Sequence, residues 1–192
     1  MKRVLAAAGI APKVKLASAS GAPISNCESY LFNNGTTKLL GLLPDKDGFR
    51  AGKALVTFDQ GGALYDVRQK RYLGSGSTFE IELEPAVPRL LALLEGRIAG
   101  IALQSPASAR RGEEVMIRFR LNEGKNLRSV AKVIVTDAAG REAPIYGGNR
   151  DIVGGAGELR FRTALNDPAG LWRVSVTEVT SGERAQAEIR IQ

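Results

Sequence analysis

The sequence predicts an all-β protein made of two tandem β-sandwich domains, and three observations lead to this prediction. The chain has 192 residues, 44% of them hydrophobic and 24% charged, which suits two globular units of about 95 residues each. Its 22 glycines and 8 prolines exceed ordinary usage, as expected of many short strands joined by turns. Apolar and polar residues alternate along most segments, whereas helical periodicity is confined to the first few residues.

The first half, residues 1–95, is predicted to form one β-sandwich behind a short N-terminal helix over 2–8, ended by Gly9. This charged start and short apolar run also resemble the opening of a signal peptide, although the run is at the lower limit of length for one. A hairpin is predicted at Asn33-Asn34-Gly35, since Asn-Gly between two apolar segments favours a tight turn. The strands are expected over 13–16, 27–32, 37–43, 54–58, 64–67, 72–73, 78–84 and 89–94, with Gln60-Gly61-Gly62 as a turn.

The segment 78–84 has the clearest strand pattern in the chain. Three apolar residues alternate with three glutamates, which places Phe79, Ile81 and Leu83 on one face and Glu80, Glu82 and Glu84 on the other. The carboxylates of a glycoside hydrolase face each other across a cleft, whereas these three point the same way. We interpret them as an exposed face that also discourages edge aggregation.

The second half, residues 96–192, is predicted to form an immunoglobulin-like sandwich of about seven strands. These strands are expected over 98–103, 115–121, 129–136, 142–146, 159–163, 171–176 and 185–191. Trp172 shares a strand face with Val174 and Val176, so we expect it to be buried between the sheets. The pairs Gly147-Gly148 and Gly154-Gly155 are predicted to be loop glycines rather than a phosphate cradle.

The charge pattern argues against a nucleic-acid partner. The net charge is +7, from 27 basic and 20 acidic residues, and a nucleic-acid binder would gather that excess on one face among aromatic rings. Here the basic residues are dispersed, and the densest runs, 68–71 and 110–111, lie beside predicted turns. No stretch approaches 18 consecutive apolar residues, so no membrane span is predicted either.

The residues needed for catalysis or metal binding are scarce. The chain has no histidine, which removes the commonest general base and the commonest metal ligand. Its one cysteine, Cys27, is expected to pack as a small hydrophobic residue. Asp45-Lys46-Asp47-Gly48 resembles the opening of a calcium loop, but the twelfth position holds Val56 instead of glutamate, so a solvated turn is expected. We therefore predict no enzyme activity, no cofactor and no metal.

Exposed aromatic rings would be the sign of a carbohydrate-binding module, because sugars stack on them. Tyr65 and Tyr72 bracket the predicted turn at 67–71 and are expected to be half-exposed. They are the candidate carbohydrate contacts. Asn34-Gly35-Thr36 has the form of a glycosylation sequon, but the hairpin turn already accounts for it.

Several stretches of the first half carry a family resemblance. They are 4–14, 29–35, 40–43, 64–68, 72–74 and 79–84. Together they resemble the C-terminal β region of large bacterial β-galactosidase-like proteins, in which a catalytic barrel and a trimerisation domain come first. The catalytic carboxylates of those proteins lie in the barrel, so the resemblance transfers no catalytic residue to this chain.

The second half resembles the immunoglobulin-like modules appended to bacterial surface and secreted proteins. The residues that carry this resemblance are 112–115, 135–140, 167–172 and 174–176. Both resemblances imply a non-catalytic accessory region of a larger, glycoside-hydrolase-related bacterial protein that is secreted, periplasmic or on the cell surface. Its expected partners are upstream domains of the same or a partner polypeptide. The alternatives are a carbohydrate-binding module that uses Tyr65 and Tyr72, or a surface adhesion or stalk domain.

Overall fold

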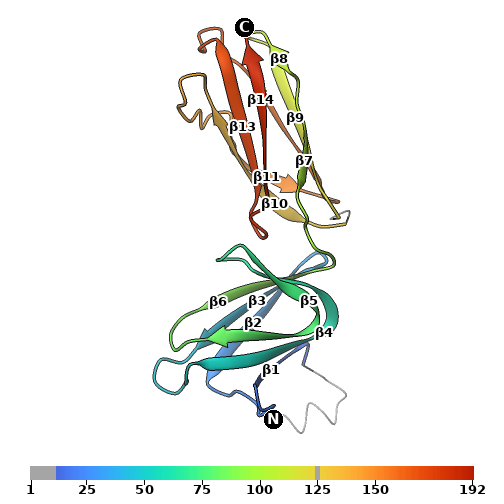
Figure 1. Cartoon of the computed structure of the whole chain (residues 1–192), viewed down its shortest axis with the longest axis vertical. Helices are drawn as coiled ribbons and strands as arrows, with labels where there is room; N and C mark the ends of the chain where they lie inside the picture. Colours follow the sequence, from blue (N-terminus) through green and yellow to red (C-terminus); the bar gives the residue numbers. More distant parts are fainter. Residues whose placement is uncertain (1–11, 124–125) are drawn as a thin grey trace.

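The computed structural model describes residues 12–123 and 126–192, and this part of the chain is all-β (Figure 1). It contains fourteen strands and no helix, so the all-β prediction is confirmed. None of the described residues forms a helix with the length and apolarity that crossing a membrane requires. The helix predicted over 2–8 lies outside the described residues.

Six strands lie in the first half of the chain: β1 (Val14–Ser18), β2 (Cys27–Asn34), β3 (Thr37–Pro44), β4 (Gly52–Asp66), β5 (Arg71–Leu83) and β6 (Arg89–Leu94). They form one antiparallel sheet in the order β1-β4-β6-β3-β2, with β5 beside β4. The early part of β4 pairs with β1 and its late part with β6, so the long β4–β5 hairpin bends from one layer to the other (Figure 1). The layers enclose a core that includes Leu40, Val56, Phe79 and Leu91.

The turn predicted at Gln60-Gly61-Gly62 is wrong, because β4 runs through it. A register shift between Thr57 and Gly62 marks a bulge or irregularity in the β4–β5 pairing. A Cβ atom at Gly62 would lie 2.4 Å from the carbonyl oxygen of Leu94, so glycine is needed there for the close approach of β4 to β6. In the same way β5 continues past Gly74 and Gly76, which have positive φ, so the two predicted segments 72–73 and 78–84 are one strand.

The hairpin predicted at Asn33-Asn34-Gly35 is confirmed. Asn34 pairs with Thr37, which leaves Gly35 and Thr36 as a two-residue loop between β2 and β3. Gly35 has a φ of +61°, a left-handed conformation that glycine adopts without steric cost.

Eight strands lie in the second half: β7 (Ile101–Gln104), β8 (Ser108–Ala109), β9 (Glu114–Leu121), β10 (Ser129–Thr136), β11 (Gly148–Ile152), β12 (Ala156–Arg162), β13 (Gly170–Glu178) and β14 (Arg184–Ile191). They form a five-stranded sheet in the order β11-β10-β13-β14-β8 and a three-stranded sheet in the order β12-β9-β7. β8 and β14 pair in parallel, and the other pairings described for these two sheets are antiparallel. Alternate residues of both sheets fill the core between them.

Trp172 lies in this core, as its alternation with polar residues predicts. Only 1% of the residue is exposed, and its ring nitrogen donates a hydrogen bond to the carbonyl oxygen of Pro168 at 2.9 Å. The ring packs against Tyr146, which stacks in turn on Phe161. These contacts make Trp172 a structural residue of the second sandwich.

The strand predicted over 142–146 is wrong. That segment contributes only an isolated bridge between Thr136 and Glu142, and the strand forms later, at Gly148–Ile152. Pro144 has no N–H to give to a ladder, and the Tyr146 N–H instead closes a turn onto the carbonyl of Ala143. Ala143 and Tyr146 of this loop therefore pack against the core, whereas Ile145 is 84% exposed.

In the described residues, no strand that ends by Leu94 pairs with a strand that begins at Ile101 or later. Residues 95–100 connect the two sets of sheets. The boundary at 95/96 and the immunoglobulin-like character of the second half stay predictions. The two halves are nevertheless packed together, because Ala63, Tyr65 and Leu94 belong to the same buried apolar cluster as the core of the second half.

Candidate functional site

Tyr65, one of the two candidate carbohydrate contacts, lies inside the protein. It is 1% exposed at the end of β4, so the expectation that it is half-exposed is wrong. Its hydroxyl oxygen accepts a hydrogen bond from the backbone N–H of Ile98 at 2.8 Å. Burial raises the pKa of this hydroxyl, and the Ile98 N–H partly offsets the shift. The ring is therefore a packing residue between the two halves and presents no face to a sugar.

Tyr72 is half-buried, as expected, but its ring is already covered by protein groups. Its centroid lies 5.4 Å from that of Tyr65, and the guanidinium of Arg97 lies over it at 4.8 Å. Such a cation–π contact stabilises by about 0.5–1 kcal/mol at exposed sites and by more where water is excluded. Its hydroxyl is hydrogen-bonded to that of Ser75 at 2.6 Å. Tyr72 thus ties β5 to the connecting segment that carries Arg97.

Two turns extend this contact. Lys70, in the turn between β4 and β5, lies against Gly182, in the turn between β13 and β14. A Cβ atom added to Gly182 would lie only 2.8 Å from the Cβ of Lys70. Gly35, in the β2–β3 hairpin, lies against Arg128 of the second half, with 3.2 Å between an added Cβ and the Arg128 Cδ. We call the part of this contact formed by Tyr65, Lys70, Tyr72, Arg97, Ile98 and Gly182 the junction.

A buried carboxylate holds the β13–β14 turn in shape. Glu178 is 0% exposed. It accepts hydrogen bonds from the backbone N–H groups of Thr180 at 3.0 Å and Ser181 at 2.6 Å, and from the hydroxyls of Ser129 and Ser181. A buried carboxylate is stable only when it is well hydrogen-bonded. The bonds from Thr180 and Ser181 fix the turn that contacts Lys70, and the bond from Ser129 ties Glu178 to β10. Glu178 is therefore explained as a structural group of the junction.

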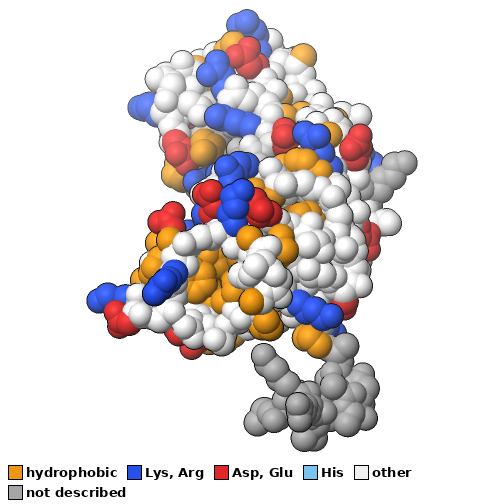
Figure 2. Space-filling model, turned by 60° about the horizontal axis from the view of Figure 1, so that its bottom comes forward, with side chains coloured by type: hydrophobic (Ala, Val, Ile, Leu, Met, Phe, Trp, Pro, Cys, Tyr) orange, Lys and Arg blue, Asp and Glu red, His pale blue; other side chains and the backbone are white. Residues whose placement is uncertain are grey.

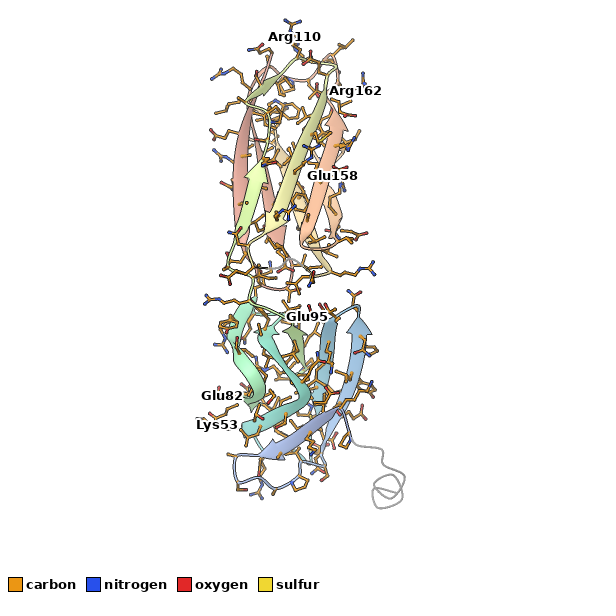
Figure 3. All side chains as sticks on the ribbon, turned by 90° about the vertical axis from the view of Figure 1, so that its right-hand side faces the viewer. Lys53, Glu82, Glu95, Arg110, Glu158 and Arg162 are labelled. Carbon is orange, nitrogen blue, oxygen red and sulfur yellow. The ribbon has the colours of Figure 1, made fainter. Side chains whose placement is uncertain are left out.

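The acidic row predicted over 78–84 is exposed, with Phe79, Ile81 and Leu83 buried on the opposite face, as expected. Glu80 forms an ion pair with Lys53 at 2.7 Å, and Lys53 and Glu82 project from the same side of the first sandwich (Figure 3). The nearest buried carboxylate, Asp66, pairs with Arg89 at 3.0 Å and also caps the β4–β5 turn through the Gln69 N–H. Glu80 and Asp66 therefore already have a basic partner, whereas Glu82 and Glu84 form no ion pair in the described part of the chain.

Other candidates from the sequence have ordinary surroundings. The residues of Asp45-Lys46-Asp47-Gly48 are exposed, and no described set of three His, Cys, Asp or Glu side chains could hold a metal ion. Cys27 is half-buried, and burial is the main cause that raises its thiol pKa, so the thiolate is disfavoured. On the face drawn in Figure 2, basic and acidic side chains are interspersed, as the sequence predicts.

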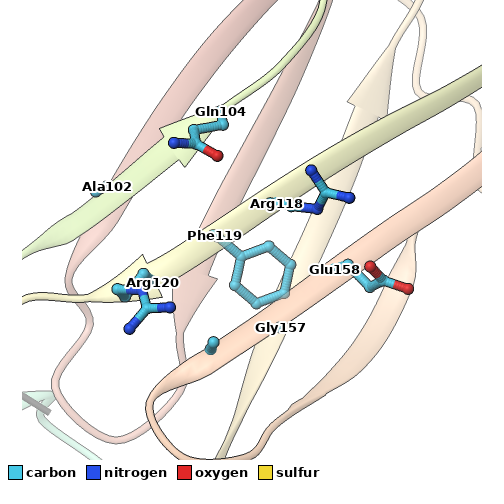
Figure 4. Close-up of a pocket in the computed structure, with 8 residues that line it drawn as sticks. Ala102, Gln104, Arg118, Phe119, Arg120, Gly157 and Glu158 are labelled. Atoms are coloured by element: carbon cyan, nitrogen blue, oxygen red, sulfur yellow. The ribbon is translucent and has the colours of Figure 1, made fainter. Parts of the chain in front are cut away.

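The sequence did not predict a depression on the outer face of the three-stranded sheet. It has a volume of about 410 Å³ and is drawn in Figure 4. Two cross-strand rows line it: Ala102, Arg120 and Ala156 in one, and Gln104, Arg118 and Glu158 in the other. We call it the arginine depression. From the sequence alone, the alternation of Arg118 and Arg120 with apolar residues in β9 could have predicted that both arginines lie on one outer face. The alanines beside Arg120 could not be predicted, because they are brought there by the cross-strand register.

No protein-family model and no curated protein sequence matches the chain. The resemblance of the first half to β-galactosidase-like proteins and of the second to immunoglobulin-like modules therefore stays a prediction. The junction and the arginine depression are the two features from which a function can be argued.

Proposed function

We propose that the chain is a non-catalytic accessory region of a larger secreted or surface bacterial protein related to glycoside hydrolases, and that it acts as a rigid structural module. The observation that carries this proposal is the position of Tyr65, which is buried in one apolar cluster with the core of the second half and hydrogen-bonded to Ile98. The stretches 64–68 and 72–74, which resemble β-galactosidase-like proteins, form this end of the β4–β5 hairpin.

Tandem sandwiches move relative to each other unless the contact between them is apolar and extensive. If the two halves rotated relative to each other about residues 95–100, Tyr65 would become exposed and the cation–π contact of Tyr72 would be lost. The same rotation would separate Lys70 from Gly182. Glu178 keeps the turn that meets Lys70 in one conformation. These contacts favour one fixed arrangement of the two halves, which is the property a spacer or supporting module needs.

An exposed apolar surface on the first sandwich supports a contact with a neighbouring domain. Tyr30 and Phe32 of the edge strand β2 are 52% and 58% exposed, and Leu43 of β3 is 43% exposed on the same face. Adjacent exposed apolar residues of this size are typical of surfaces that contact another protein. We propose that this face of the first sandwich meets the upstream domains.

Electron–electron distance measurements between spin labels test the rigid module. In a Cys27→Ala background, labels at Glu84→Cys and Arg190→Cys report across the junction, and labels at Lys132→Cys and Arg190→Cys report within one sheet. We expect both pairs to give a single distance distribution of similar width. A distribution across the junction that is broad or has several maxima, beside a narrow one within the sheet, would contradict the proposal.

Screening against chromogenic glycosides and esters tests the non-catalytic part. We expect no turnover, since the chain has no histidine and both Asp66 and Glu80 are held in ion pairs. Turnover that persists after repurification and is lost on substituting a single carboxylate would show that the chain is an enzyme.

A further inference from the structure

The arginine depression has a charge arrangement that differs from an ordinary strand surface. On the outer face of β9, Arg118 faces Gln104 on one side and Glu158 on the other, while Arg120 faces an alanine on both sides. Both oxygens of Glu158 are taken by Arg160, at 2.8 and 3.3 Å. Within the described residues, neither Arg118 nor Arg120 forms an ion pair or a hydrogen bond. Arg118 lies near enough to Glu158 to help lower the pKa of that carboxyl, after the larger effect of Arg160. Both guanidinium groups line the depression.

The floor of the depression is formed by small residues. It is formed by Ala102 and Ala156 and by Gly157, beneath which the ring of Phe119 lies (Figure 4). A Cβ at Gly157 would lie 2.4 Å from the Phe119 ring, so only glycine fits at this point. Small residues around two long cationic side chains leave room for one face of a ring-shaped ligand unit.

We infer that the arginine depression binds an acidic polysaccharide, with Arg118 and Arg120 pairing with carboxylates on the sugar chain and Gln104 bonding to its hydroxyls. Arginine suits this ligand because its planar guanidinium matches a carboxylate in two parallel hydrogen bonds. The two arginines stand two residues apart on one strand, with about 6.6 Å between their Cα atoms, so they can meet successive acidic groups of a linear chain.

The shape of the site favours a polymer over a small anion. The depression is open, and Arg118 and Arg120 are exposed side chains, so each contact is weak, and affinity must come from several contacts along one chain. It also disfavours nucleic acid, because Phe119, the aromatic residue among those described as lining the depression, is 2% exposed and offers no ring for bases to stack on. The inference goes beyond the rigid module and does not depend on it.

Isothermal titration of the whole chain with polygalacturonate, alginate and hyaluronate tests this inference. We expect binding to at least one of them, and about tenfold weaker binding by Arg118→Gln/Arg120→Gln, since this variant removes both charge-assisted contacts to the carboxylates at once. The matched control is Arg110→Gln/Arg111→Gln, which removes the same charge at the far end of the second sandwich, where Figure 3 places Arg110. We expect this control to bind within about twofold of the unmodified chain, because screening limits distant surface charges.

Each alternative has its own outcome. Equal weakening by both double variants would show a general effect of positive charge and overturn the proposal. Equal binding of polygalacturonate and its methyl ester would exclude carboxylate recognition. Tighter binding of single-stranded DNA would assign the face to nucleic acid, and the absence of binding to all three polysaccharides would reject the site. Because Arg118 and Arg120 are exposed, circular dichroism of their double variant is expected to match that of the unmodified chain.

Discussion

The hydroxyl of Tyr65 and the backbone N–H of Ile98 are joined by a 2.8 Å hydrogen bond that links the end of β4 to the segment leading into the second sandwich. Both residues are 1% exposed. The sequence placed Tyr65 at a half-exposed binding surface and Ile98 at the start of a strand. The structure makes them partners across the junction instead.

Replacing Tyr65 by phenylalanine should destabilise the protein by about 1–3 kcal/mol, because it leaves the buried Ile98 N–H without an acceptor while keeping the ring. Chemical denaturation measures the free energy of unfolding. Tyr30→Phe is the matched control, since Tyr30 is 52% exposed and its hydroxyl bonds only to Glu28. Equal stability of Tyr65→Phe and the unmodified chain would mean that the bond does not stabilise the junction.

Tyr65 should also make stability fall at high pH. Its folded pKa is raised above the ordinary value of 10.0, mainly by burial, so the folded protein keeps this proton while the unfolded chain loses it. The stabilisation is therefore complete below pH 10 and is lost as the pH rises through the folded pKa. Because the chain has three other tyrosines, the measurement is the difference in unfolding free energy between the unmodified chain and Tyr65→Phe from pH 8 to 11. A difference that stays constant or grows with pH would contradict this assignment.

Replacing Trp172 by alanine should cost about 3–5 kcal/mol, the usual effect of truncating a buried large aromatic residue. Its neighbour Leu171 points outward and is 46% exposed, so Leu171→Ala should change stability by less than about 0.5 kcal/mol. Thermal unfolding followed by near-ultraviolet circular dichroism reports on both. An unchanged Tm for Trp172→Ala would be incompatible with its place in the core.

Replacing Gly62 by alanine should destabilise the first sandwich by about 1–3 kcal/mol, the range for overpacked sites, because the new Cβ would lie 2.4 Å from the Leu94 carbonyl oxygen. Gly52 lies in the same strand, has no atom within 4 Å of an added Cβ and has no positive φ. Gly52→Ala is therefore expected to be neutral or slightly stabilising in urea unfolding. Equal effects of the two substitutions would show that β4 does not approach β6 as described.

Local patterns predicted most of the strands. The alternation of Phe79, Ile81 and Leu83 with glutamates correctly predicted the buried face of that strand, since a strand has a two-residue period. The same period correctly placed Trp172, Val174 and Val176 together on a buried face. The predicted turn at Gly62 was wrong because glycine has two uses that look alike in a sequence. Gly62 resembles a turn residue, but it lies inside a strand and allows the backbone of Leu94, more than thirty positions away, to pack closely against it.

The candidate site was harder to predict than the fold. The burial of Tyr65 depends on the second sandwich, which lies beyond its own local sequence. The arginine depression depends on the pairing of Arg120 with Ala102 and Ala156, residues from three strands whose register no local pattern specifies. The charge alternation of β9 was visible in the sequence, but the pairing of Glu158 with Arg160 instead of with Arg118 could be found only in three dimensions.

Backbone ¹⁵N relaxation tests the rigid junction most directly. The measurement compares the rotational correlation times of residues in β1–β6 with those of residues in β7–β14, in the unmodified chain and in a Tyr65→Ala/Arg97→Ala variant. The account predicts one shared correlation time for both halves of the unmodified chain and two shorter, separate ones in the variant. Two separate correlation times in the unmodified chain, with values expected for independent units of half the mass, would contradict it.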